Sequence, residues 1–471
     1  MELVGRNKEI IRLNELFERN RSEFVVLYGR RRIGKTFLVR KMFQNRMSFQ
    51  LTALANASLS NQLLNFHYSL VQTFGDSSSN KSPSNWLEAF QLLKQGLENL
   101  PEGKKLVFID ELPWLDTPRS GFLSAFEHFW NDWASNRNDV LLIVCGSAAS
   151  WMIGKLLKNR GGLHNRVTER IHLKPFCLAE CKAMIESMGL EWSLHQLLEM
   201  YQVLGGVPYY WSLLSKGKSA TQLIDDLLLG GSALLRNEMQ NLYASLFTNY
   251  QAHEAIVKAL STQKSGLNRD KLLQLSKLPN GGGTTQILEE LEQSDFIRKY
   301  SPIGRKSRDS IYQLTDFFTL FHFSFLENSK KATPQSWMSY IDHPRHRAWS
   351  GYSFELLCLM HTDQIKRAMG ISGIEVNVAS WCAKGDKPIQ IDLLMERRDQ
   401  VINIFEMKFS IAPYSIDKSY QQELLTKIDT FRRETKTRSA VHLVLVSPYG
   451  LQANSYSGTI QLALTGEDLI K

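Results

Sequence analysis

A glycine-rich turn between an apolar run and a helical pattern constrains this chain more than any other feature. Residues 24–28 are apolar and precede the motif G-x-x-x-x-G-K-T, which runs from Gly29 to Thr36. Glycines let the backbone curl so that several N–H groups point at phosphate oxygens, and the following helix adds positive charge at its N-terminus. Strand, turn and helix in this order predict an α/β domain with a parallel sheet that binds ATP or GTP.

The residue types in this motif assign roles. Lys35 is predicted to reach the β- and γ-phosphates, and the Thr36 hydroxyl is predicted to ligate Mg²⁺. The other positions of the loop and of the helix start that we expect against the nucleotide are Gly29, Arg30, Arg31, Arg32, Ile33, Gly34 and Phe37.

Two further apolar runs end in polar residues. Residues 106–109 lead into Asp110 and Glu111, and residues 140–146 lead into Ser147. Asp110 is predicted to hold Mg²⁺ through water, and Glu111 to polarise the attacking water. Parallel strands present ligand-facing groups at their carboxyl ends, so Ser147 is a candidate sensor of the γ-phosphate. A simple Gly-Ser turn leaving the strand is the other interpretation.

Arginines after this third run offer a candidate for stabilising charge on the γ-phosphate. They are Arg160, Arg166 and Arg170. We take Arg166 as the candidate arginine finger, acting within one chain or from a second copy in an oligomer. Solvated loop charges are the alternative interpretation.

The bulk properties set the class of protein. A chain of 471 residues is long enough for about three domains. Its net charge of +9 fits a nucleic-acid partner. The N-terminus has no signal-peptide pattern and no apolar run is long enough for a membrane span, so we expect a cytoplasmic location with reduced cysteines.

Four segments together resemble a known family, the archaeal-type ATPases of the AAA+/STAND group. The segments are Val4-Gly5-Arg6, the glycine-rich motif, residues 108–111, and residues 205–210. The resemblance implies that Gly5 and Arg6 lie near the adenine, and it favours ATP over GTP. It also implies a helical lid after the nucleotide domain.

The middle of the chain divides into two predicted domains. Residues 176–245 have a helical pattern broken at Gly205-Gly206-Val207-Pro208, which is either a nucleotide sensor or hinge, or a plain connection between helices. Residues 246–325 have the order helix, helix, helix, hairpin, which predicts a winged helix.

The charges in the predicted winged helix favour two different kinds of partner. Arg305, Lys306 and Arg308 at the wing tip suit DNA phosphates. The third helix carries Glu289, Glu290 and Glu292, which suit a major groove poorly. We therefore expect this helix to pack against protein.

A second set of chemically active residues lies in residues 326–471. Glu406 and Lys408 are two apart on a predicted strand, so their side chains leave on one face, continuing an apolar row. Asp392 lies on the strand paired to it, and Glu355 on a preceding helix. Asp392 and Glu406 are predicted to bind Mg²⁺, with Glu355 completing the shell and Lys408 positioning the attacking water.

This order of helix, hairpin, helix and strand with D…E-x-K resembles the PD-(D/E)xK nuclease superfamily. Ile391 stands where the name-giving proline would be. The resemblance implies a restriction-endonuclease-like domain that cuts DNA.

The whole pattern predicts four parts: a P-loop ATPase core (1–175), a lid (176–245), a winged helix (246–325) and a nuclease-like domain (326–471). The function that it favours is an ATP- and Mg²⁺-dependent DNA-processing enzyme. A STAND-type signalling or defence switch that binds a protein partner is the alternative, and a nuclease fold that only binds DNA is the third.

Overall fold

The computed structural model describes residues 2–75, 81–157, 163, 165–247, 249–303, 310–327, 336–341, 343–383 and 389–471. The chain divides into two compact units, Met1–Lys174 and Pro175–Lys471, named here the N-terminal unit and the C-terminal unit. Each unit is described by itself. Within the described residues, no helix has both the length and the apolar character that a membrane crossing requires.

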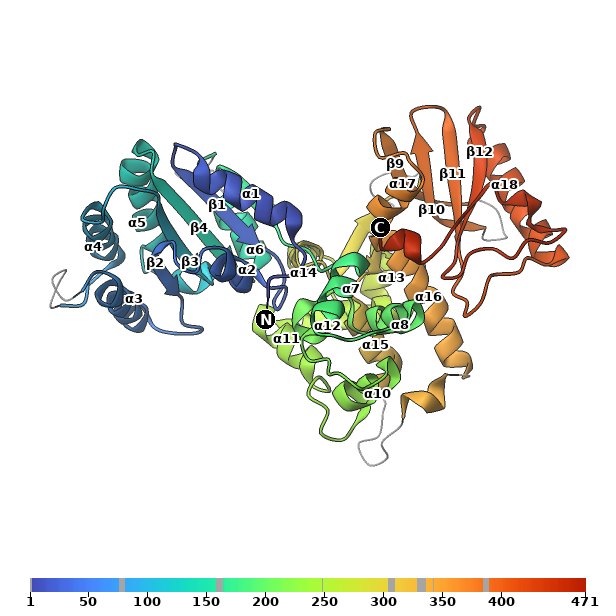
Figure 1. The fold of residues 1–471 in the computed structure, drawn as a ribbon, viewed down its shortest axis with the longest axis horizontal. Coiled ribbons are helices and arrows are strands. Elements are labelled where there is room, and N and C mark those ends of the chain that lie inside the picture. The colour runs from blue at the N-terminus through green and yellow to red at the C-terminus, as the bar shows by residue number, and fades with distance from the viewer. Residues whose placement is uncertain are drawn as a thin grey trace. The chain divides into compact units, whose positions relative to one another are not determined.

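A parallel sheet forms the centre of the N-terminal unit (Figure 1), with its strands in the order β2-β3-β4-β1-β5. The strands are β1 (Glu23–Tyr28), β2 (Met47–Thr52), β3 (Lys105–Asp110), β4 (Val140–Gly146) and β5 (Glu169–His172). The expected α/β fold with a parallel sheet is confirmed, and β4 separates the strand before the glycine-rich turn from the strand that ends in Asp110.

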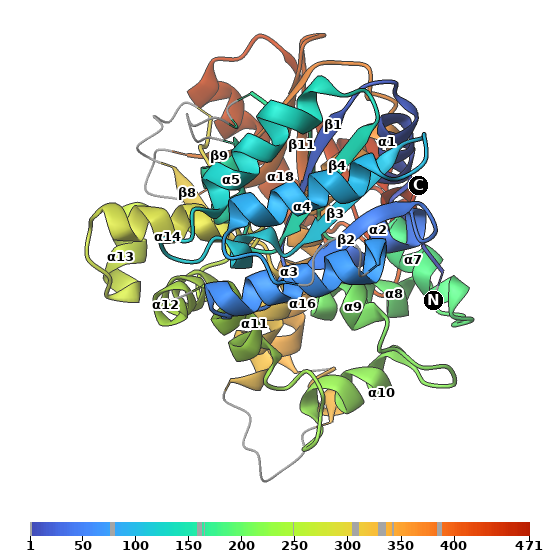
Figure 2. The same cartoon turned by 90° about the vertical axis from the view of Figure 1, so that its left-hand side faces the viewer.

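Both faces of this sheet are covered because its strands are apolar on both sides. Val25 and Leu27 face a core shared with α1 (Asn7–Glu18) and α2 (Lys35–Met42). Phe24 and Val26 face the opposite core. The helices on that side, seen from the front in Figure 2, are α3 (Leu59–Phe74), α4 (Trp86–Glu98) and α5 (Phe122–His128).

The C-terminal unit begins with helices. They are α7 (Leu178–Ser187), α8 (Leu194–Leu204), α9 (Pro208–Trp211), α10 (Ala220–Ile224) and α11 (Glu238–Leu246). Three of these helices begin with a side-chain cap. Ser193 and Ser219 accept backbone N–H bonds at the starts of α8 and α10, and the Glu180 carboxylate accepts the Cys177 N–H at the start of α7.

A small antiparallel sheet with strand order β6-β8-β7 follows. Its strands and the helices around it are α12 (Tyr250–Ser261), β6 (Leu267–Asn268), α13 (Arg269–Ser276), α14 (Gly282–Gln293), β7 (Ile297–Tyr300) and β8 (Ile311–Leu314). These elements come in the predicted order. The predicted wing tip, with Arg305, Lys306 and Arg308, lies outside the described residues.

The last region contains a mixed sheet with strand order β13-β12-β11-β10-β9. Its elements are α16 (Pro344–Met360), α17 (Thr362–Ala368), β9 (Val376–Cys382), β10 (Gln390–Arg397), β11 (Val401–Met407), α18 (Lys418–Thr435), β12 (Ala440–Val446) and β13 (Leu462–Leu464). β9, β10 and β11 pair antiparallel, whereas α18 crosses over to make β12 parallel to β11.

Gly206 packs against backbone rather than against side chains. A Cβ atom at this position would lie 1.9 Å from the carbonyl oxygen of Phe176. The Phe176 N–H also donates to the Gly206 carbonyl at 2.6 Å, so the two segments are held together. This gives the predicted Gly-Gly-x-Pro break a packing role in the connection between α8 and α9, and its role as a sensor or hinge stays a prediction.

Gly206→Ala is therefore expected to destabilise the C-terminal unit by about 3 kcal/mol, because backbone atoms cannot move aside as a flexible side chain can. Urea unfolding measures the change. Gly231→Ala is the matched control, since a Cβ atom there meets nothing within 4 Å. Equal stability of the two variants would contradict the packing role.

Candidate functional site

Glycine is required at both ends of the turn between β1 and α2. Gly29 has φ +145°, and a Cβ atom there would lie 2.4 Å from the carbonyl oxygen of Leu173. Gly34 has φ +88° and is the N-cap of α2. Both backbone conformations are ones that residues with a side chain adopt only with strain. The turn therefore has the shape that aims backbone N–H groups inward.

Lys35 is buried at the centre of this turn and is 5% exposed. Its ammonium donates to the carbonyl oxygens of Gly29 at 2.9 Å and Arg30 at 3.0 Å. Burial lowers the pKa of Lys35, while the nearby charge of Glu111 opposes that shift. The ammonium is thus hydrogen-bonded to backbone oxygens of the turn, where the motif predicts that it would bind phosphate oxygens.

Thr36 and Asp110 face each other across the ends of α2 and β3. The Thr36 hydroxyl donates to Asp110 Oδ2 at 2.8 Å, and Asp110 is 3% exposed. Burial raises the pKa of Asp110, and the Thr36 hydrogen bond acts in the opposite direction. Two hard oxygen donors at contact distance fit the donor set that Mg²⁺ prefers. Mg²⁺ bound there would neutralise phosphate charge.

Glu111 and Ser147 form a bidentate contact. The Ser147 hydroxyl donates to one carboxylate oxygen of Glu111 at 2.5 Å, and the Ser147 N–H donates to the other at 3.2 Å. Lys35 donates to the same hydroxyl at 3.3 Å. Ser147, just after the end of β4, thus connects the predicted phosphate-binding lysine to the predicted water-polarising carboxylate.

Arg6, just before α1, is hydrogen-bonded to the glycine-rich turn between β1 and α2. It is 5% exposed and donates to the carbonyl oxygens of Ile33 at 3.0 Å and Lys174 at 2.6 Å. Gly5 precedes it with φ +68°. These bonds place the guanidinium beside the glycine-rich turn, and the predicted contact of Gly5 and Arg6 with adenine stays a prediction.

The remaining predicted nucleotide contacts differ in exposure. Arg30 is 1% exposed, Arg31 is exposed, and Arg32 and Phe37 are half-buried. Arg166 is exposed, and its backbone N–H donates to the Leu163 carbonyl at 3.0 Å. Arg170 is an exposed residue of β5, and Arg160 lies outside the described residues.

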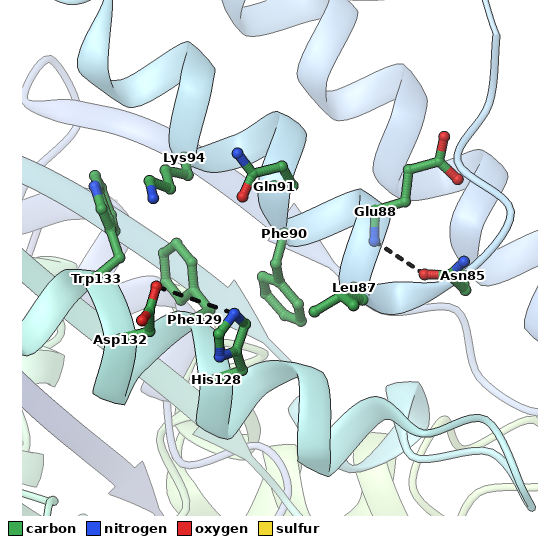
Figure 3. A pocket seen from close by; sticks show the side chains of 10 residues that line it. All are labelled: Asn85, Leu87, Glu88, Phe90, Gln91, Lys94, His128, Phe129, Asp132 and Trp133. Carbon is green, nitrogen blue, oxygen red and sulfur yellow. Dashed lines mark hydrogen bonds and ion pairs between the residues drawn. The ribbon is translucent and has the colours of Figure 1, made fainter.

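A groove of about 470 Å³ lies elsewhere on the N-terminal unit, between α4 and the helical segment from α5 to Trp133 (Figure 3). Phe90, Phe129 and Trp133 line it, with Lys94 at its edge. None of the residues predicted to bind nucleotide lines this groove. The candidate nucleotide site is therefore defined by the glycine-rich turn and the strand ends, and not by this groove.

The second set of predicted residues gathers in the C-terminal unit around β10 and β11. Leu393 pairs with Phe405, and the same antiparallel register places Asp392 opposite Glu406. Directly opposite residues point to the same face of a sheet. Ile402 and Ile404 pack on α18, so the row that Glu406 continues faces that helix.

Glu406 is 7% exposed and is bound by two side chains of α18. Its carboxylate forms an ion pair with Lys427, and it accepts a hydrogen bond of 2.9 Å from the Tyr420 hydroxyl. The ammonium of Lys408 lies 4.8 Å from the centroid of the same tyrosine ring. Tyr420 and Lys427 were missed by sequence reasoning, although their spacing of seven residues puts them on one face of α18.

The other two predicted carboxylates are also largely shielded from water. Burial raises the pKa of Glu355 to about 7, and the charge of Asp392 adds to this. Burial likewise raises the pKa of Asp392, which accepts a hydrogen bond of 2.6 Å from Gln390. The described residues contain no group of three or more His, Cys, Asp or Glu side chains placed to hold a metal ion. The carboxylates are thus neighbours, but Glu406 is held by α18 rather than gathered with the others.

One carboxylate of the predicted third helix of the winged helix has a buried partner. Glu290 on α14 lies 2.8 Å from Nε2 of His253 on α12, and His253 is 3% exposed. Glu289 and Glu292 are exposed. The pair holds α14 against α12.

Comparison with known proteins identifies the N-terminal part. Residues 3–214 match a family described as the ATPase domain predominantly from Archaea. An uncharacterized protein of Methanocaldococcus jannaschii, MJECL04, is 25% identical over 395 residues, 83% of each chain. The uncharacterized ATP-binding protein MJ0423 of that organism is 40% identical over 43 residues, which are 9% of this chain and 73% of that protein.

Two solved structures have a backbone that partly superposes on this chain. One is the Walker-type ATPase PABY2304 of Pyrococcus abyssi, with a TM-score of 0.48 and 17% sequence identity. The match covers 68% of this chain and 96% of that one. The ORC2 protein of Aeropyrum pernix, in ADPNP-ADP complexes, has a TM-score of 0.40 and 18% identity, covering 68% and 93%. The family match, together with the glycine-rich turn, Lys35 and Asp110, confirms the predicted ATPase domain. Through residues 3–214, the chain belongs to the family of ATPase domains found predominantly in Archaea.

Proposed function

We propose that this chain couples ATP binding and hydrolysis in its N-terminal unit to Mg²⁺-dependent cleavage of DNA in its C-terminal unit. The observation that carries the proposal is the register of β10 and β11, which sets Asp392 opposite Glu406, with Lys408 two residues further on. Acidic residues that are 7% exposed, as Glu406 is, need a functional or structural reason to be there.

In the N-terminal unit, Lys35 and the backbone N–H groups of the turn would hold the phosphates. Thr36 and Asp110 would hold Mg²⁺, Glu111 would orient water, and Arg166 is the proposed finger. In the C-terminal unit, Asp392 and Glu406, aided by Glu355, would hold Mg²⁺, which supplies charge stabilisation to a phosphodiester when bound. Glu406 would have to exchange its bonds to Lys427 and Tyr420 for the ion. Lys408 would position the attacking water on the same face as Glu406.

The elements between these sites have the order of a winged helix after a helical lid, and we propose these domain assignments. The net charge of +9 supports DNA as the partner. A second copy of the chain would be required if Arg166 acts in trans, and a cytoplasmic location fits free thiols at all five cysteines.

The test is cleavage of plasmid and linear DNA with Mg²⁺ or Mn²⁺, with and without ATP. The parent protein is expected to cut, and Lys408→Ala and Glu406→Gln are expected to stop cutting, because each removes a group from the acidic face. Lys418→Ala is the matched control, since it removes an exposed ammonium from the first turn of α18. Lys35→Ala reports whether ATP controls the cut.

Cutting that persists in Lys408→Ala and Glu406→Gln would exclude this site as its source. Absence of cutting by the parent protein under every condition would refute the nuclease proposal. The ATPase assignment would stand in either case, because it rests on the other unit.

An ATP-driven switch is the second candidate function. The ion pair and hydrogen bond that Lys427 and Tyr420 make to Glu406 favour it, because they occupy the carboxylate that a nuclease would use to bind Mg²⁺. A switch predicts slow ATP turnover and a change of oligomeric state with nucleotide. Light scattering with and without ATP separates it from a DNA-stimulated ATPase.

A further inference from the structure

The β7–β8 hairpin of the C-terminal unit holds an arginine, Arg298, against its own side chains. Arg298 is half-buried, and its Nε–H donates to Gln313 Oε1 at 2.7 Å. Its guanidinium lies 4.5 Å from the centroid of the Tyr300 ring. Both partners belong to the hairpin, so the hairpin fixes the position of the guanidinium. The bond from Nε uses one of five N–H donors.

The hairpin is attached to the elements that carry the acidic residues. The Ile303 N–H, just after β7, donates to the Ser380 carbonyl of β9 at 2.9 Å. Lys264 donates to the Ala348 carbonyl of α16 at 2.8 Å, and the Gln313 amide donates to the Lys264 carbonyl at 2.8 Å. These bonds therefore join the hairpin to β9 and α16. Strand β9 pairs with β10, and α16 carries Glu355.

Charges in this network are close enough to affect one another. Burial lowers the pKa of Arg298, and the charges of Tyr300, Tyr352 and Asp392 oppose that shift. The geometry agrees with this. Strand β9 pairs with β10 so that Trp381 lies opposite Ile391 and Ala379 opposite Leu394. Ser380, which accepts the bond from Ile303, therefore lies opposite the stretch of β10 that contains Asp392. The positive charge of the hairpin thus lies within electrostatic reach of the acidic face.

An acidic face alone repels a phosphodiester, so a nuclease site needs cations beside its carboxylates. Lys427 is paired with Glu406, and Lys408 lies against the Tyr420 ring. Arg298 offers a planar set of donors, which matches phosphate oxygens better than an ammonium does.

We propose that Arg298 is a phosphate-binding residue of the C-terminal site, supplied by the β7–β8 hairpin to a nucleic acid held at Asp392 and Glu406. This inference rests on the proposed nuclease function. The site would then combine residues of the predicted winged helix and of the predicted nuclease-like domain. Arg298 and Asp392 are 94 residues apart in the sequence.

The experiment measures binding of a short fluorescein-labelled DNA duplex by anisotropy in Ca²⁺ over a series of NaCl concentrations, and cutting of the same duplex in Mg²⁺. For Arg298→Gln, we expect the slope of log affinity against log salt to become shallower by about 1, with weaker binding and slower cutting. Lys299→Ala is the matched control, because this exposed lysine is the next residue of β7 and points to the opposite face.

Arg298→Lys keeps the charge and loses the planar donors, so it is expected to keep the salt slope while cutting more slowly. If Arg298→Gln fails to fold, as judged by its melting temperature, Arg298→Lys decides: cutting equal to the parent overturns the inference.

The possible failures are distinguishable. A parent protein that cuts, with Arg298→Gln equal to Lys299→Ala in slope and rate, refutes the role of Arg298 and leaves the nuclease proposal intact. A parent that binds the duplex without cutting refutes the nuclease proposal, and the salt slope still decides the role of Arg298. A parent that neither binds nor cuts overturns both.

Discussion

Lys35→Ala is expected to reduce ATP turnover by roughly 10²–10³-fold, the usual cost of removing one donor that stabilises transition-state charge. The ammonium of Lys35 is 5% exposed and already lies 2.9 Å from the Gly29 carbonyl oxygen, at the centre of the turn. Alanine removes the ammonium that the motif assigns to the β- and γ-phosphates. The same change removes the donor to the Ser147 hydroxyl, which binds Glu111.

Release of inorganic phosphate from ATP measures this effect, and titration with a fluorescent ATP analogue separates lost binding from lost hydrolysis. Lys41→Ala is the matched control, because this exposed lysine lies on the same helix, 6.0 Å from the Phe37 ring centroid. Turnover by Lys35→Ala equal to that of Lys41→Ala would contradict the assigned role. Urea unfolding of both variants checks that neither loses the fold.

The nucleotide site could be predicted because its chemistry is local in sequence. One turn of eight residues carries the glycines, Lys35 and Thr36, and the apolar runs before Asp110 and Ser147 identify the neighbouring strands. Parallel strands that end at one edge of a sheet must bring these residues together, which is why the hydrogen bond from Thr36 to Asp110 follows from the pattern.

The second site shows what a sequence pattern leaves out. Two-residue periodicity placed Glu406 and Lys408 on one face, and the strand pairing of Asp392 follows from the hairpin. The pattern does not say which side chain of α18 reaches which carboxylate, because that depends on how a helix rotates and slides on the sheet. The ion pair between Lys427 and Glu406 therefore emerged only from the structure.

Arg298 was harder still to predict. It lies in a different predicted domain, and the bond between the Ile303 and Ser380 backbones attaches its hairpin to β9, the strand paired with β10. Contacts between segments that are far apart in sequence carry no local periodicity. The domain boundaries have the same difficulty: the chain divides at Lys174, close to the predicted end of the ATPase core at residue 175, but the C-terminal unit is one compact body, and its three predicted domains stay predictions.

His361 is expected to contribute less to the stability of the C-terminal unit as the pH falls below about 6.5. This residue is 1% exposed, and its Nε2 accepts the Leu178 N–H at 3.0 Å. Its Nδ1 therefore carries the proton and donates to the Leu357 carbonyl at 2.8 Å. The neutral ring joins the end of α16 to the first turn of α7, and a second proton would break the bond to Leu178.

Burial lowers the pKa of His361 to about 4, whereas an unfolded chain has a histidine pKa of about 6.5. The unfolded state therefore binds the extra proton first as the pH falls. The stability from the neutral ring is fully present above about pH 6.5 and is lost down to about pH 4, a total of about 3 kcal/mol. Glu355 acts in the opposite direction, since its pKa is raised to about 7 and the folded state keeps that proton.

A variant without the imidazole separates the two effects. His361→Gln is expected to be less stable than the parent at about pH 7.5, and the difference should shrink by about 2 kcal/mol at about pH 5. Urea unfolding at both pH values measures the free energies, and hydrogen exchange of residues 177–181 reports the Leu178 amide directly. Because Glu355 is present in both proteins, its contribution cancels in the difference. Parallel loss of stability in parent and variant would mean that His361 is not the residue whose protonation unfolds this unit.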